Sequence, residues 1–187
     1  MTPTSLGSAP ANWFVGIPVP PGGWTSRIPR PPPGTRAFDP ADLHLTIVFL
    51  GPCGEARARA AWDLARWVGP AIAVRLGAVV PMGDPRRPGA LSALLARGEA
   101  EVGAIIARLR GPLAEAAGMR PDPRPPRPHL TLARIGRRAT AEQRAAALRW
   151  AAALDLAAVE LSLSGLALYT RAAPGQDRRF RIVQARG

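Results

Sequence analysis

The sequence contains only two histidines, and both begin the same four-residue pattern. His44-Leu45-Thr46-Ile47 and His129-Leu130-Thr131-Leu132 lie 85 positions apart (129 − 44). A Leu-Thr continuation follows a histidine by chance in about one case in a few hundred, so its occurrence after both histidines indicates a shared role. An imidazole can take up or release a proton near neutral pH. The repeated pattern therefore predicts a pair of acid–base residues, His44 and His129.

Each pattern lies in a stretch of β-forming residues, and strand geometry decides which side chains share a face. Side chains at i and i+2 project together, so His44 lies beside Thr46 and His129 beside Thr131, while the apolar residues between them face the core. A hydroxyl donates to a phosphate oxygen and an imidazole moves a proton. Two such pairs around one phosphorus predict hydrolysis of a cyclic phosphodiester, with one imidazole activating water and the other protonating the departing ribose oxygen.

Neither a metal nor a cofactor is expected to assist this chemistry. The chain has two histidines, one cysteine and no clustered carboxylates, which is a poor ligand set for a metal ion. All 25 basic residues are arginine, so a Schiff-base lysine and a phosphate-loop lysine are excluded. The net charge of +12 and the planar guanidinium fork favour a polyanionic partner such as RNA.

The order of predicted elements indicates an α+β fold with helices over a mostly antiparallel sheet. Expected strands cover residues 12–19, 43–50, 72–82, 91–95, 129–135, 159–170 and 180–184, and expected helices cover residues 55–68, 99–117 and 140–154. Thr140 and Gln143 match a capping box at the start of the third helix. Residues 20–34 are rich in proline and glycine and are expected to form an extended loop.

The length of 187 residues and the apolar content of 47% are typical of one globular domain. Residues 1–11 lack the features of a signal peptide and are expected to form a flexible tail. The sequence has no apolar run long enough to span a membrane. The single cysteine, Cys53, excludes an internal disulfide and favours a reducing cytoplasm. We therefore expect a cytoplasmic monomer without membrane contact.

The surroundings of the two motifs resemble a known family. The stretches 36–51 and 127–134 resemble the two motifs of the two-histidine phosphoesterase superfamily, and within it the RNA 2′,3′-cyclic phosphodiesterases, also described as 2′-5′ RNA ligases. The stretch 14–20 is similar to the family's first strand. Leu168-Tyr169-Thr170 and Gly175 are similar to its C-terminal strand and turn.

The resemblance implies two pseudo-symmetric lobes, each a small antiparallel sheet with outer helices, around a central cleft. It implies hydrolysis of a terminal 2′,3′-cyclic phosphate to a 2′-phosphate, with a possible reverse 2′-5′ ligase reaction, on RNA or oligonucleotide ends. His129 would activate water and His44 would protonate the 3′ oxygen. Thr46, Thr131 and Arg134 would bind the phosphate.

Some roles stay open at this stage. Arg134 lies five residues after His129, which places it on the opposite face of a regular strand unless a bulge re-aims it. Phe14 and Tyr169 either stack on a base or pack in the core. Two other functions fit the same scaffold: a phosphodiesterase for a small cyclic nucleotide such as ADP-ribose cyclic phosphate, and a non-catalytic RNA-binding module.

Overall fold

A computed structural model describes residues 11–173, 175 and 178–187, so the tail expected over residues 1–11 lies, except for Ala11, outside the described residues. The described strands are β1 (Trp13–Pro18), β2 (Thr35–Ala37), β3 (His44–Gly51), β4 (Ile72–Asp84), β5 (Arg87–Arg97), β6 (His129–Ile135), β7 (Glu160–Leu163), β8 (Leu166–Arg171) and β9 (Phe180–Arg186). The α-helices are α1 (Glu55–Leu64), α2 (Glu99–Ala116) and α3 (Ala141–Ala152), and single 3-10 turns occur at Thr25–Arg27 and Pro40–Asp42.

Most elements lie where the sequence predicts them, and the differences have local causes. The predicted strand over residues 159–170 is two strands, β7 and β8, because Gly165 between them has a φ of 78°, which a strand residue does not adopt. Strand β2 was not predicted, since it contains only three residues at the end of the proline-rich loop. The capping box at α3 is confirmed: Gln143 N–H donates to Thr140 Oγ1 at 3.2 Å and Thr140 N–H donates to Gln143 Oε1 at 3.0 Å.

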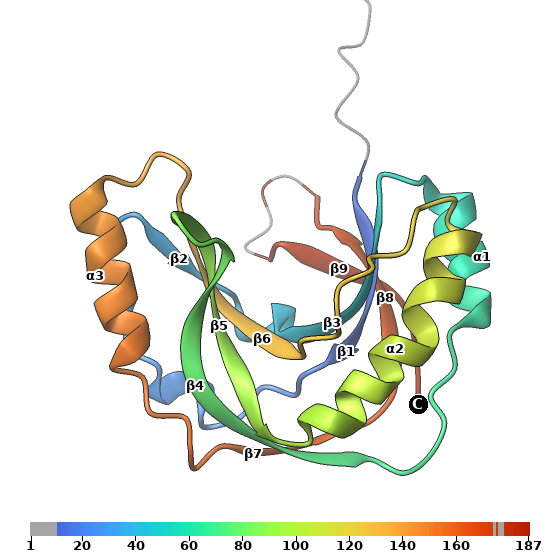
Figure 1. The fold of residues 1–187 in the computed structure, drawn as a ribbon, viewed down its shortest axis with the longest axis horizontal. Coiled ribbons are helices and arrows are strands. Elements are labelled where there is room, and N and C mark those ends of the chain that lie inside the picture. Colours follow the sequence, from blue (N-terminus) through green and yellow to red (C-terminus); the bar gives the residue numbers. More distant parts are fainter. Residues whose placement is uncertain (1–10, 174, 176–177) are drawn as a thin grey trace, which may run out of the picture.

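The strands form one curled sheet in the order β7-β4-β5-β6-β3-β1-β8-β9, with β2 added beside β6 (Figure 1). Every strand pair among the described residues is antiparallel. The main path divides into two halves of four strands that meet where β6 pairs with β3. The predicted α+β class with two related lobes is confirmed, and the two motif-bearing strands form the seam between the lobes.

The helices cover one side of this sheet. α2 packs on β3, α1 packs on α2, and α3 packs against β4 on the other flank (Figure 1). Leu45 of β3 and Leu130 of β6 are at most 1% exposed and share one apolar core with Ile105 and Ile106 of α2. A second, smaller cluster contains Phe14, Ala167 and Tyr169. Among the described helices, none is both long and apolar enough to cross a membrane.

Candidate active site

The pairing of β3 with β6 places the two histidine motifs side by side. Leu45 lies directly opposite Leu130 in this antiparallel pair, and opposed residues of two strands share a face. Both leucines face the core, so the residues on either side of them, His44, Thr46 and their counterparts in β6, all project from the other face. His44 and His129 are then diagonal neighbours, with Cα atoms about 7–8 Å apart. Side chains at this spacing can reach one small group placed between them.

A β-bulge in β6 puts Arg134 on the same face as the motif. Two consecutive residues of β5 pair with Thr131 and Ala133, so Leu132 is an extra residue in β6. The extra residue shifts the alternation of faces by one, and Arg134 therefore projects with Thr131. Arg134 is near enough to His44 for its charge, in addition to the larger effect of burial, to lower the pKa of that ring. The bulge that the position of Arg134 requires is thus present in the structure.

The same bulge occurs at the equivalent place in β3 and exposes an aromatic ring. Thr46 and Val48 pair with consecutive residues of β1, so Ile47 is the extra residue. Phe49 consequently occupies in β3 the position that Arg134 occupies in β6, five residues after the histidine. Its side chain is 55% exposed. Phe49 was not predicted as a site residue, although the equal offset from each histidine was a signal that the two positions correspond.

Both imidazoles are held in the same way, through Nδ1. His44 Nδ1 lies 2.6 Å from the carbonyl oxygen of Asp42, and His129 Nδ1 lies 2.7 Å from the carbonyl oxygen of Arg127. A carbonyl oxygen only accepts, so Nδ1 donates in both cases and the proton of the neutral ring is assigned to it. Each Nε2 is therefore the ring nitrogen without a proton in the neutral imidazole.

The two histidines differ in their surroundings. His44 is 8% exposed and lies among the rings of Phe14, Tyr169 and Phe180, with centroid distances of 4.6, 5.1 and 5.3 Å. Burial lowers the pKa of His44 to about 4, and the hydrogen bond to Asp42 opposes this shift only in part. At neutral pH the His44 ring is therefore uncharged in the free protein. His129 is half-buried.

Phe14 and Tyr169 support His44 and are not accessible to a base. Phe14 is 4% exposed and Tyr169 is 1% exposed. Their rings are stacked on each other at 4.7 Å with an interplanar angle of 3°. Of the two roles left open by the sequence, core packing is the one that the structure shows, and base stacking by these two residues is wrong because their ring surfaces are already covered.

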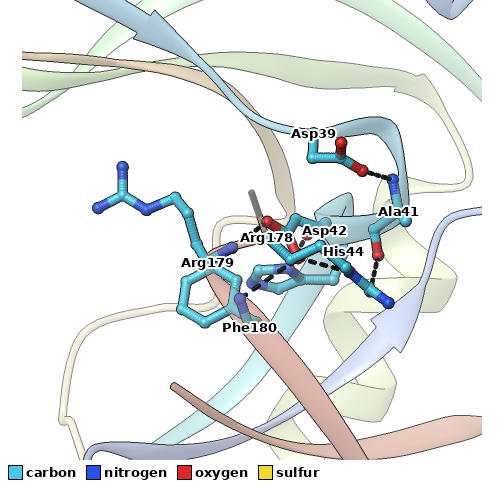
Figure 2. Close-up of polar contacts among 7 residues, drawn as sticks. All are labelled: Asp39, Ala41, Asp42, His44, Arg178, Arg179 and Phe180. Atoms are coloured by element: carbon cyan, nitrogen blue, oxygen red, sulfur yellow. Dashed lines mark hydrogen bonds and ion pairs between the residues drawn. The ribbon is translucent and has the colours of Figure 1, made fainter. Parts of the chain in front are cut away.

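A buried carboxylate lies directly behind His44 (Figure 2). The side chain of Asp42 is fully buried and accepts from the backbone N–H groups of Arg179 at 2.6 Å and Phe180 at 3.3 Å. The guanidinium of Arg178 completes an ion pair with it at 3.4 Å. Asp42 thus contacts the start of β9 through its carboxylate and His44 through its backbone carbonyl. This role was not predicted from the sequence, although Asp42 lies two positions before the histidine.

Ser92 is a second supporting residue that sequence reasoning missed. It is 0% exposed, and its Oγ lies 3.1 Å from Thr131 Oγ1. This contact restricts the rotation of the Thr131 hydroxyl. Ser92 is the single polar residue in the apolar run 91–95, and a lone hydroxyl in such a run was the available signal. Among the described residues, no three metal-binding side chains lie together.

Positive charge gathers around the two motifs. Arg134 lies opposite Arg36 in the β2–β6 pair, and burial, together with the nearby charge of Arg179, lowers the pKa of Arg134. Within the described part of the chain, no carboxylate forms an ion pair with Arg134. Guanidinium groups held together in this way favour an anion between them.

Comparison with known proteins agrees with this geometry. The family model for LigT like phosphoesterases matches residues 98–176, which include the second motif. No curated protein matches the sequence. E. coli LigT in its apo form superposes with a TM-score of 0.68 at 20% identity, covering 96% of this chain and 98% of LigT.

Two further crystal structures have the same fold. E. coli LigT complexed with 3′-AMP gives a TM-score of 0.67 at 19% identity, with 95% and 97% of the two chains covered. The protein TT0787 of Thermus thermophilus gives 0.66 at 21% identity, with 93% and 96% covered. With two His-x-Thr motifs side by side and a LigT fold throughout, the resemblance of the chain to the two-histidine, LigT-like phosphoesterases is confirmed.

Proposed function

We propose that the protein hydrolyses 2′,3′-cyclic phosphates at RNA ends to 2′-phosphates by acid–base catalysis between His44 and His129. The observation that carries this proposal is the matched anchoring of two imidazoles on adjacent strands. Each ring donates through Nδ1 to the carbonyl two residues before it, which leaves two Nε2 atoms for one phosphorus. A protein that only bound RNA would not need two proton carriers held in this way.

The proposed step transfers one proton at each side of the phosphorus. One imidazole takes a proton from water as the water oxygen forms a bond to phosphorus. The bond from phosphorus to O3′ breaks, and the other imidazole gives its proton to O3′. The phosphate stays on O2′. Thr46, Thr131 and Arg134 bind the non-bridging oxygens, on which negative charge increases in the transition state.

The roles implied by the family resemblance make His129 the base and His44 the acid. Burial works against this assignment in the free protein, because it lowers the pKa of His44 to about 4 and leaves the ring without a proton to give. A bound cyclic phosphate adds a negative charge beside the ring, and a neighbouring opposite charge favours the imidazolium. Binding of the substrate itself therefore raises the pKa of His44 and prepares it as the acid.

The decisive experiment identifies the end group that the protein forms. Purified protein is incubated with an oligoribonucleotide that ends in a 2′,3′-cyclic phosphate, with a chelator present, and the product is examined by phosphorus NMR. We expect a 2′-phosphomonoester, formed at the same rate with and without the chelator. A 3′-phosphomonoester would show that the bond from phosphorus to O2′ breaks in place of the bond to O3′. Binding without any product would favour the non-catalytic alternative.

A small cyclic nucleotide remains the second candidate substrate, because the site itself accommodates one phosphate. Comparison of kcat/KM for ADP-ribose cyclic phosphate, a mononucleotide cyclic phosphate and an oligoribonucleotide with the same end separates the candidates. The arginine content favours the oligoribonucleotide.

Phe49 is expected to stack on the base of the terminal nucleotide, in place of the buried Phe14 and Tyr169. Stacking of one base on an aromatic ring contributes about 1–3 kcal/mol. The Phe49→Ala variant should therefore raise KM for a mononucleotide cyclic phosphate about 5- to 150-fold, whereas Phe49→Trp should retain tight binding. Leu64→Ala removes an apolar side chain of similar exposure, 53%, at the end of α1 and serves as the control. Equal KM values for Phe49→Ala and Leu64→Ala would contradict the assignment.

A further inference from the structure

The two motif threonines lie opposite different residues of the neighbouring strands. In β5, Ser92 pairs with Thr131 next to the register shift that makes the bulge at Leu132. In β1, Gly16 pairs with Thr46 next to the corresponding register shift. Ser92 and Gly16 therefore occupy equivalent positions in the two lobes, and opposed residues share a face. Only Ser92 can offer a hydroxyl to the threonine that it faces.

The lobe that contains Gly16 has no room for a side chain at this position. A Cβ atom there would lie 2.9 Å from the backbone oxygen of Leu45, 3.4 Å from the ring of His44 and 3.5 Å from the ring of Tyr169. The first of these distances is too short for a real contact, so the close packing around His44 requires glycine. The two halves of the site are therefore built differently: one seats a buried imidazole, and the other places a hydroxyl beside its threonine.

The burial of Ser92 decides the direction of its hydrogen bond to Thr131. Ser92 is 0% exposed, so bulk water does not reach its hydroxyl, and Thr131 Oγ1 at 3.1 Å is its single hydrogen-bond partner among the described residues. A hydroxyl has one proton to donate and can also accept. If Ser92 accepted from Thr131, the Ser92 proton would be buried without an acceptor, which is unfavourable. Ser92 therefore donates, and the proton of Thr131 is left for another acceptor.

We propose that Ser92 is a positioning residue that makes Thr131 a fixed hydroxyl donor to the reacting phosphate. This inference rests on the proposed function for the reaction itself. Because Thr131 Oγ1 accepts from Ser92, its own proton is available to a non-bridging phosphate oxygen, on which negative charge increases in the transition state. Thr46 faces Gly16 and receives no such bond from β1. A donor that is oriented before the reaction contributes to kcat more than to KM, since its bond strengthens as the charge develops.

The first measurement reads the orientation of Thr131 without any substrate. Three-bond NMR couplings to the Thr131 methyl group report its χ1 rotamer in the free protein. We expect one rotamer in the wild type and averaged couplings in Ser92→Ala, in which no hydroxyl holds Thr131. The control is Thr170→Val, which removes another buried hydroxyl, bonded to the carbonyl of Asn12 at 3.3 Å. Strands β3 and β1 separate β8, which carries Thr170, from β6, so the Thr131 couplings should not change in this control.

The second measurement compares the effect of Ser92→Ala on turnover in two backgrounds. Removal of one oxyanion donor lowers kcat by about 10²- to 10³-fold, so loss of its orientation alone should lower kcat by less, about 5- to 30-fold, with little change in KM. In Thr46→Val, Ser92→Ala should lower kcat by the same factor. In Thr131→Val, which keeps the shape of threonine and removes its hydroxyl, Ser92→Ala should have no further effect. An equal loss in both backgrounds would overturn the proposal.

Failure of the proposed function and failure of this inference give different results. If the wild type is active and Ser92→Ala retains its kcat at a matched folded fraction, the function stands and the role of Ser92 is wrong. If the wild type turns over no cyclic-ended oligoribonucleotide, the proposed function fails. The couplings of Thr131 then decide alone whether Ser92 orients this hydroxyl, and a single rotamer in Ser92→Ala would exclude it.

Discussion

Replacing His129 with alanine is expected to lower kcat by about 10²- to 10⁴-fold, the usual contribution of one general acid or base. His129 is half-buried and its ring is bonded to the carbonyl of Arg127, so its removal leaves the fold intact. Replacing His44 should have an effect of the same size. For His44, glutamine is the better substitute, because alanine would leave a hole among the rings of Phe14, Tyr169 and Phe180.

The double variant distinguishes a catalytic pair from two separate contributors. Residues that act as one unit give losses that do not add, so a variant lacking both histidines should be about as slow as either single variant. Thermal unfolding of every variant is measured beside kcat. Wild-type turnover in His129→Ala, at a matched folded fraction, would exclude the mechanism.

The motif residues were predictable because they need only the alternation of a strand. The same His-Leu-Thr pattern at the start of two β-rich segments indicated which side chains project together. Strand β6 covers the residues that were expected. What the sequence did not contain was the pairing of β3 with β6. Long-range pairing depends on how all the described strands close into one sheet. That pairing converts two separate motifs into one site.

The sequence also could not place the residues that follow each motif. Simple alternation put Arg134 on the wrong face, and only the register between β5 and β6 reveals the bulge at Leu132. The equivalent bulge at Ile47 in β3 could not be read from the sequence either, and so Phe49 was missed. Phe14 and Tyr169 were plausible stacking rings on composition alone, but their burial follows from the pairing of β1 with β8, which brings them face to face.

The buried carboxylate of Asp42 was hidden for a related reason. Its partners, Arg178, Arg179 and Phe180, lie 136 to 138 positions away in the sequence. An acidic residue near a motif is ordinarily exposed, so nothing local indicated that Asp42 would be enclosed. The structure shows that one residue, Asp42, contacts both the start of β9 and the ring of His44.

Replacing Asp42 with asparagine is therefore expected to damage both stability and catalysis. The Asp42 carboxylate accepts from the backbone N–H groups of Arg179 and Phe180, and a buried donor left without its acceptor costs about 1–3 kcal/mol in the free energy of unfolding. The guanidinium of Arg178 is 41% exposed and is left to solvent. The asparagine amide would also place a donor against the backbone N–H groups of Arg179 or Phe180. Asp122→Asn is the matched control: it removes an exposed carboxylate from a pair with Arg124, and urea unfolding should barely change.

A positioning role for Asp42 predicts more than lost stability. The backbone carbonyl of Asp42 holds Nδ1 of His44, so a shift of this segment releases the ring from its fixed orientation. Under conditions where Asp42→Asn is fully folded, kcat should fall at least tenfold while KM changes little. Nitrogen NMR of the His44 ring should show loss of the single Nδ1–H form. The pKa of His44 should stay below its ordinary value, because burial persists and the negative charge of Asp42, which raises this pKa, is removed. Retention of the wild-type kcat and of the Nδ1–H signal in the folded variant would restrict Asp42 to anchoring β9, because a carboxylate that positions His44 cannot be removed without changing that ring.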